Sequence, residues 1–213
     1  MPDKLYLGFL ETSAAYTEAH TRLREHVTRH GISDIGFELG PPDNGRLPCR
    51  IILRGCKKTL CELSDIYPPF DDIRCWMERV LRFDHIGRHH EEVLTLDCRD
   101  AVYSVHLMHA GWEDASSKGY RDRRNLSVFI AVRSGADEPL LSELCRTYRL
   151  IGNLYCAVLD CFATYRERFD NNQDWFFIAD SPFERRPTAE VLYENFRSPV
   201  IENSIHFHPK RKR

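Results

Sequence analysis

The stretch DEPLLSELCRTYRLIGNLYCAVLDCFATYRERFD, residues 137–170, decides the expected fold. Large apolar side chains recur through it at alternating steps of three and four residues, which places them on one face of an α-helix. Most flanking positions are also apolar or small, so the helix would be covered on several sides. The pattern predicts one long helix in the interior of the fold. Its apolar stripe is Leu141, Leu144, Tyr148, Ile151, Tyr155, Val158, Phe162, Tyr165 and Phe169.

The ends of this stretch carry residues that favour the ends of a helix. Asp137 can cap the free N–H groups, and Pro139 suits the first turn. Arg166 and Arg168 are favoured near the negative end of the helix dipole, and Asn171 suits a left-handed terminating turn.

Charged residues argue against a membrane span, which needs about 20 residues with few charges. Arg146, Arg149 and Asp160 interrupt the run. A straight helix of this length would reach roughly 50 Å, so a kink near Gly152 is expected. A helix packed inside one chain is the preferred interpretation, and a seam between two copies in a homodimer is the alternative.

Three segments before this helix show the two-residue alternation of strands and predict an antiparallel meander. They are residues 94–98, 101–107 and 126–132. Across a two-residue turn, Leu96 would face Tyr103 and Leu94 would face Val105, which puts both apolar sets on one side. We expect this sheet to pack on the long helix.

The N-terminal half predicts the order β-α-β-β-α, which is compatible with a ferredoxin-like first half if residues 94–98 complete it. A Gly- and Pro-rich turn at 40–45 predicts a hairpin. The expected elements are strands at 4–10, 35–39, 47–54 and, less clearly, 59–63, and helices from residue 12 or 13 to 29 and over 73–81. A short strand at 175–178 and a helix from 187 or 188 to 197 follow the long helix. The predicted class is α+β.

The composition suits one domain of 213 residues, with 42% hydrophobic and 29% charged residues. A subdivision into 1–66 and 67–198 is the alternative, and 199–213 is expected to be a tail. Formal net charge is −2, but without the four basic residues at the end, Lys210 to Arg213, 26 basic residues face 32 acidic ones. The acidic body argues against a general nucleic-acid surface.

Eight cysteines occur without a C-x-x-C pair, and the first residues lack the layout of a signal peptide. We therefore expect a reduced, cytoplasmic protein without structural disulfides. No cofactor is predicted.

Histidines and carboxylates are densest around residue 90. His85, His89 and His90 precede the first meander strand, and His106 lies on the next one. Such residues could converge on a metal, and Glu91, a diagonal neighbour of His106, could instead form an acid–base pair with it. Ordinary surface histidines are the competing interpretation.

The segment 110–124 is long for a connection in a compact domain, and such loops are usually functional or disordered. Trp, Tyr and Arg residues often dominate binding energy at protein interfaces. The candidate partner-binding residues are Trp112, Glu113, Asp114, Tyr120, Arg121, Arg123 and Arg124. The alternative is an exposed connection without a function.

Nucleophile elbows and phosphate-binding glycine loops are absent from the sequence. We therefore favour a non-catalytic protein-interaction module: an inhibitor, an immunity-type protein or an assembly adaptor that binds another protein. A metal-assisted or acid–base hydrolase is the first alternative. A nucleic-acid-associated protein, using the arginines of the loop and the basic end, is the second. The basic end is compatible with a localisation signal, a nucleic-acid contact or a solubilising tail, of which we favour the solubilising tail.

Overall fold

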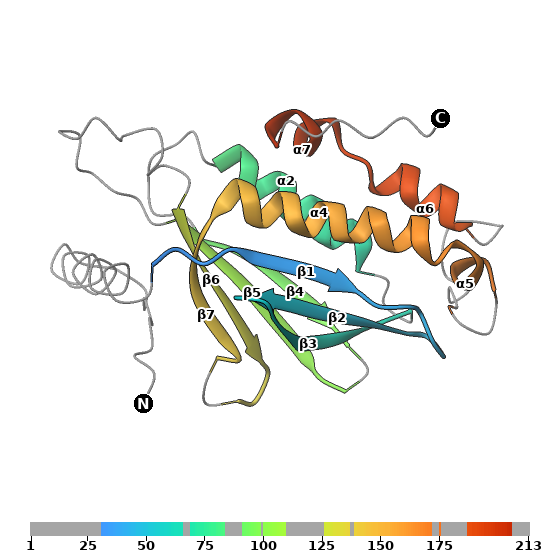
Figure 1. Cartoon of the computed structure of the whole chain (residues 1–213), viewed down its shortest axis with the longest axis horizontal. Helices are drawn as coiled ribbons and strands as arrows, with labels where there is room; N and C mark the ends of the chain where they lie inside the picture. Colours follow the sequence, from blue (N-terminus) through green and yellow to red (C-terminus); the bar gives the residue numbers. More distant parts are fainter. Residues whose placement is uncertain are drawn as a thin grey trace, which may run out of the picture.

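A computed structural model of the chain describes residues 31–65, 69–83, 91–98, 100–109, 126–136, 139–171, 175 and 187–205. These residues form two antiparallel sheets, of three and four strands, and five helices. The fold class is α+β, as the sequence predicts. The helices lie together on one side of the two sheets (Figure 1).

The first sheet is the meander β1 (Ile35–Leu39), β2 (Arg46–Leu53) and β3 (Cys56–Ser64). The hairpin predicted across residues 40–45 is confirmed, since β1 and β2 pair antiparallel. Arg54 and Gly55 join β2 to β3 with positive φ angles of 49° and 79°. Positive φ at both central positions is the signature of the type I′ turn, whose twist matches that of paired strands.

The second sheet is a meander of β4 (Glu91–Asp97), β5 (Val102–His109), β6 (Leu126–Arg133) and β7 (Leu141–Arg146). Its first three strands are those that the alternation predicts. The predicted register is also confirmed, because Leu96 pairs with Tyr103 and Leu94 pairs with Val105.

The long helix predicted over 137–170 is wrong in its first part. Residues 141–146 form strand β7, and α4 (Thr147–Thr164) begins only after it. In β7, Leu144 and Cys145 are both buried, although they point to opposite faces of the sheet. Periodicity cannot distinguish a strand buried on both faces from part of a buried helix. The predicted cap at Asp137 lies outside the described residues.

From Thr147 onward the chain is helical, as predicted, but the helix is interrupted at Tyr165 and not at the predicted kink near Gly152. Helix α4 runs through Gly152, and the helical path is interrupted at Tyr165 before α5 (Arg166–Asp170). Asn171 then has φ −86° and not the left-handed conformation that the sequence predicts.

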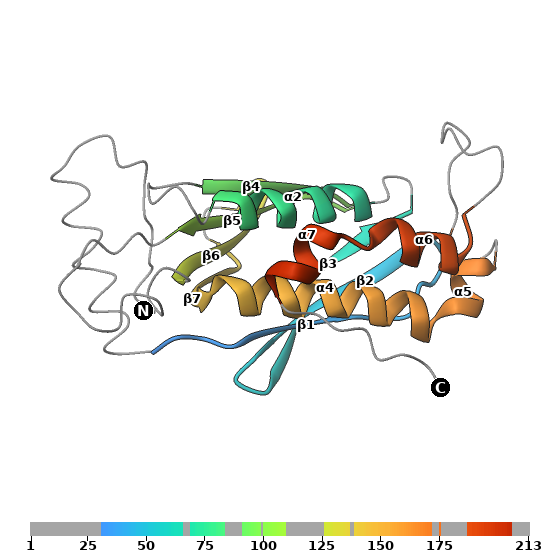
Figure 2. The same cartoon turned by 90° about the horizontal axis from the view of Figure 1, so that it is seen from above.

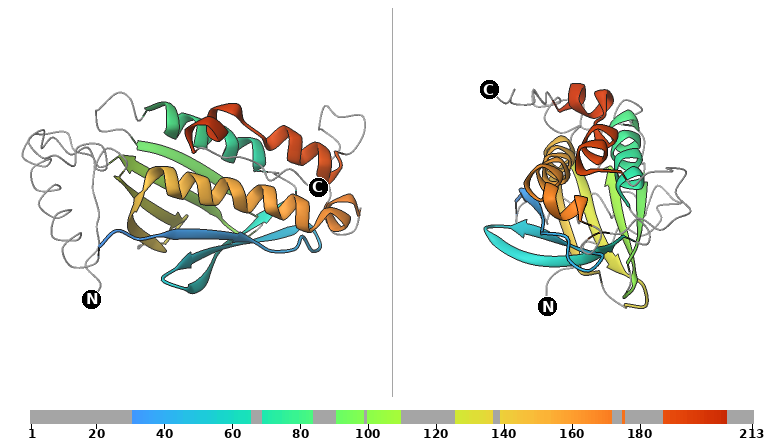
Figure 3. Two further views of the ribbon diagram at one scale, coloured as in Figure 1. Left: turned by 45° about the horizontal axis from the view of Figure 1, so that its top comes forward. Right: turned by 90° about the vertical axis from the view of Figure 1, so that its right-hand side faces the viewer.

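The remaining helices form a layer with α4. Helix α2 (Phe70–Phe83) packs on β4, α6 (Ala189–Phe196) packs on α4, and α7 (Pro199–Ser204) packs on α2. Figures 2 and 3 show α2 and α4 side by side over the sheets, with α6 and α7 along them. The main core fills the space between helices and sheets. Its largest fully buried side chains are Trp76, Phe129, Tyr155, Phe162, Phe169, Trp175 and Phe196.

Two further expectations are not met by the described residues. A ferredoxin-like first half is not confirmed, because β4 pairs with β5 and not with the first three strands. Part of the predicted tail is helix α7, whose Ile201 is fully buried. The strand predicted at 4–10, the helix predicted at 13–29 and residues 176–178 lie outside the described ranges. No helix in the described ranges is long and apolar enough to cross a membrane.

Candidate functional site

The candidate site is the face of the four-stranded sheet that points away from the helices, which we call the outer face. Strand geometry sends alternate side chains to opposite faces. Leu94, Val105 and Phe129 belong to the main core, so their sequence neighbours point outward. The outer face comprises Glu91, Val93, Thr95, Asp97, Val102, Ser104, His106, Met108, Leu126, Val128, Ile130, Val132, Ser142, Leu144 and Arg146.

On β6 and at Leu144 of β7, the outer face is largely apolar and buried. Leu126, Val128, Ile130 and Leu144 form a cluster separate from the main core, and Val128 and Leu144 have no exposed surface. Because most of β6 is buried on both faces, every residue from Val128 to Val132 is apolar.

The half of the outer face on β4 and β5 is polar and more exposed. His106 Nδ1 and Glu91 Oε1 are 2.6 Å apart, and the two side chains are 28% and 29% exposed. A carboxylate can only accept, so the ring Nδ1–H donates. Val93 and Val102 are 40% and 37% exposed. This half therefore offers an acid–base pair beside exposed apolar surface.

The structure brings together only part of the site that the sequence predicts. The diagonal Glu91–His106 pair is confirmed, with Val93 directly opposite His106. Outside the described ranges lie the other three candidate metal ligands, His85, His89 and His90, and all seven candidate partner-binding residues: Trp112, Glu113, Asp114, Tyr120, Arg121, Arg123 and Arg124. Within those ranges, no three His, Cys, Asp or Glu side chains are arranged to hold a metal ion.

The strand register places the attachment points of these segments at one end of the sheet. Glu91 pairs with Met108, Met108 with Val128, and Val128 with Leu144, so these positions form one row across the strands. Segment 84–90 joins the sheet at Glu91, and segment 110–125 connects β5 to β6 beside this row. Ser33 N donates to Leu144 O at 2.8 Å, so the described residues just before β1 also lie at this end of the sheet.

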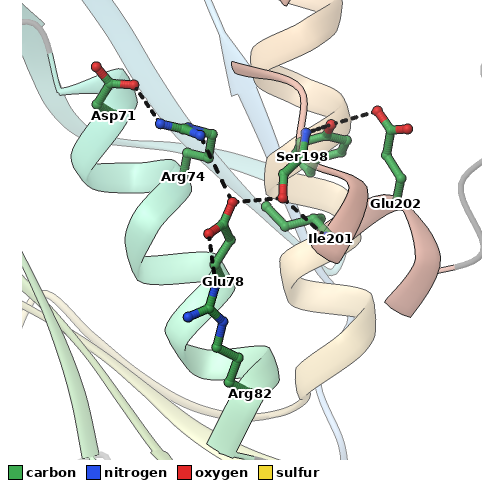
Figure 4. A network of polar contacts seen from close by, with 8 residues as sticks. Asp71, Arg74, Glu78, Arg82, Ser198, Ile201 and Glu202 are labelled. Carbon is green, nitrogen blue, oxygen red and sulfur yellow. Dashed lines mark hydrogen bonds and ion pairs between the residues drawn. The ribbon is translucent and has the colours of Figure 1, made fainter. Parts of the chain in front are cut away.

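A second polar constellation joins the helices, and the sequence does not predict it. Ser198 Oγ donates to Glu78 Oε1 at 2.7 Å and accepts from Ile201 N at 3.3 Å, which caps α7 (Figure 4). Glu78 also lies 4.0 Å from Arg74 and 3.6 Å from Arg82. Because the hydroxyl of Ser198 serves as a helix cap and has no imidazole beside it in this network, it lacks the base that activates a serine nucleophile.

Tyr155 connects this constellation to α4. Its hydroxyl donates to Glu202 Oε1 at 2.9 Å and accepts from Ser198 N at 2.9 Å. Arg197 binds both oxygens of Glu202, at 2.9 and 3.0 Å. The hydrogen bonds from Arg197 hold the pKa of Glu202 below its ordinary value. Burial opposes this effect, and the hydrogen bond from Tyr155 adds to it. We interpret the constellation as a connection that holds α7 on α2 and α4.

The eight cysteines differ in how far they are buried. All eight are free, and Cys49, Cys61, Cys98, Cys145 and Cys161 are buried. Burial, followed by a smaller effect of a nearby acidic group, raises the pKa of Cys145 to about 12. Because the thiolate is the reactive form, Cys145 is a poor nucleophile.

Comparisons with known proteins do not extend these observations. No family model, curated protein or solved structure matches the chain. The functional proposal is therefore built on geometry and sequence alone.

Proposed function

We propose that the protein is a non-catalytic protein-interaction module: an inhibitor, an immunity-type protein or an assembly adaptor. It binds its partner through the segment 110–124 and the exposed part of the outer face on β4 and β5. One observation supports the proposal: strands β5 and β6, which bracket this segment, pair with each other, and the exposed apolar Val93 lies on β4 beside β5. Binding residues are often placed on loops that a rigid scaffold positions.

The composition of the segment suits a binding role. Trp112 and Tyr120 combine a large apolar body with a polar group, and Arg121 can form several hydrogen bonds. Such residues form the anchors of many protein interfaces.

The proposal predicts the loss of a partner when the aromatic anchors are removed. A protein with both Trp112→Ala and Tyr120→Ala should bind its partner at least tenfold more weakly, since anchor residues often cost 2 kcal/mol or more each. Co-purification from the native host, followed by titration of the captured partner, measures the change. A protein with Ser116→Ala and Ser117→Ala is the matched control in the same segment. Unchanged binding by the Trp112/Tyr120 variant, with the thermal midpoint preserved, would contradict the proposal.

A hydrolase is the second candidate, because Glu91 and His106 form a hydrogen bond at 2.6 Å. A carboxylate hydrogen-bonded to an imidazole can fix its tautomer, as general acid–base catalysis requires. In its metal-assisted form, the metal would be bound by His106 together with His85, His89 and His90.

Elemental analysis and a pair of substitutions distinguish the forms of this second candidate. A metal-assisted hydrolase would retain stoichiometric metal, and its stability would fall with a chelator. A metal-free acid–base enzyme would hydrolyse activated esters and lose that activity in Glu91→Gln and in His106→Asn, whereas Thr95→Ser would retain it. No hydrolysis by the unmodified protein would remove this candidate.

A further inference from the structure

Strand β4 is an edge strand of its sheet, and its outward backbone groups follow from the hydrogen-bond pattern. Cys98 N donates to Ala101 O at 3.0 Å, which makes these two residues a hydrogen-bonded pair. Hydrogen-bonded and non-hydrogen-bonded pairs alternate along an antiparallel ladder. Val93 and Thr95 therefore belong to non-hydrogen-bonded pairs, and their N–H and C=O groups point away from β5.

Two other sheet edges in the described ranges, at β7 and β3, are less open to another strand. At β7, Ser33 forms a parallel bridge with Cys145. On β3, Lys57 and Lys58 are exposed, and charged side chains on an edge strand discourage pairing. On β4, the exposed positions between the two ends are Val93 and Thr95, which are β-branched and favour strands. Figure 2 shows β4 along one rim of the molecule.

The charges of β4 disfavour full-length pairing with a second copy of this chain. The symmetric antiparallel register that pairs all of residues 91–97 would place Val93 opposite Thr95 of the second copy and Glu91 opposite its Asp97. Like charges directly opposite each other destabilise a strand pair. Glu91 is half-buried and Asp97 is exposed, and the described residues provide no ion-pair partner for Asp97. An extended segment with basic residues at both ends would instead complement this edge.

We propose that the edge of β4 binds an extended segment of the partner protein by strand addition. The segment pairs antiparallel with residues 91–97, places Lys or Arg opposite Glu91 and Asp97, and places β-branched residues opposite Val93 and Thr95. Main-chain hydrogen bonds give such complexes their affinity, and alternate side chains give them their specificity. The inference rests on the proposed function, for which it names the mode of binding and the chemistry of the partner.

A synthetic peptide tests the inference without the native partner. Acetyl-Lys-Thr-Val-Thr-Val-Thr-Lys-amide should bind saturably in a calorimetric or fluorescence titration of the full chain. The same peptide with Glu at both ends should bind at least tenfold more weakly because of charge repulsion. A version N-methylated at its Val residues should also bind at least tenfold more weakly, since it lacks backbone donors.

A proline substitution gives the matched test on the protein side. Proline is tolerated on an edge strand where its missing N–H would face solvent. Val93→Pro should therefore keep the fold, checked by circular dichroism, and weaken peptide binding about tenfold through loss of one donor and steric hindrance. Val93→Thr keeps the donor and should bind like the unmodified protein. If Val93→Pro does not fold, the N-methylated peptide provides the same test on the other strand.

The possible results separate this inference from the proposed function. No saturable peptide binding up to about 1 mM, or equal binding by the Glu-ended peptide or by Val93→Pro, would overturn strand addition. None of these three results would affect the Trp112/Tyr120 experiment. Conversely, the Trp112/Tyr120 variant should bind the peptide normally, and it would do so even if segment 110–124 proved to have no role.

Discussion

Phe162→Ala is expected to lower the free energy of unfolding by about 3–5 kcal/mol, the range for truncating a large buried aromatic side chain. Phe162 is 1% exposed and lies at the centre of an aromatic cluster on α4. Its ring centroid is 4.8 Å from that of Phe70, 5.2 Å from that of Phe169 and 6.1 Å from that of Phe196. The substitution therefore removes contacts to three helices and leaves a cavity that they cannot easily close.

Urea unfolding monitored by circular dichroism measures this effect. Thr164→Ala, two residues later and exposed, is the control and should change the free energy of unfolding by less than about 0.5 kcal/mol. Equal effects of the two substitutions would mean that this end of α4 does not face the core.

Glu202→Gln is expected to lower the free energy of unfolding by about 1.5–3 kcal/mol at neutral pH, the range for a hydrogen bond to a charged group. Glu202 has a side chain 15% exposed, and it accepts from Arg197 and from the buried Tyr155. Glutamine retains an acceptor but loses the charge that both donors favour. The connection between α4 and α7 should therefore weaken.

The pH dependence of this difference follows from the lowered pKa of Glu202, whose ordinary value is 4.5. A group with a lowered folded-state pKa stabilises the fold fully above its unfolded pKa, and this contribution is lost as the pH falls through the folded pKa. The difference between the unmodified protein and Glu202→Gln should therefore be constant from pH 6 to 8 and should shrink below about pH 4.5. Thermal unfolding across this range measures it. Glu194→Gln is the control, since Glu194 is 61% exposed and lies 3.6 Å from the same arginine. A difference that grows on acidification would refute this assignment.

The sequence predicts local elements well where one face of an element is buried and the other is not. The alternation in β4 and β5 predicts both strands and their register, because a slip of one residue would turn Leu94 and Leu96 to solvent. The same reasoning places Glu91 diagonal to His106, as the structure has it.

Prediction fails where both faces are buried or where partners are distant in sequence. In β7, Leu144 and Cys145 are both buried, so a helical spacing fits the sequence as well as a strand does. Tyr155 requires a partner for its buried hydroxyl, but Glu202 follows 47 residues later, and no local pattern relates the two. The edge position of β4 likewise depends on the strand order of the whole sheet.

Site-specific photo-crosslinking tests the central claim, that a partner protein binds at the outer face and the adjoining edge of the four-stranded sheet. A photoreactive amino acid at Val93, 40% exposed on β4, is compared with one at Val191, 41% exposed on α6. With the purified partner, we predict efficient crosslinking from Val93 and little from Val191, and loss of the Val93 product in the Trp112/Tyr120 variant. Equal crosslinking from the two positions, or crosslinking from Val191 alone, would contradict the claim.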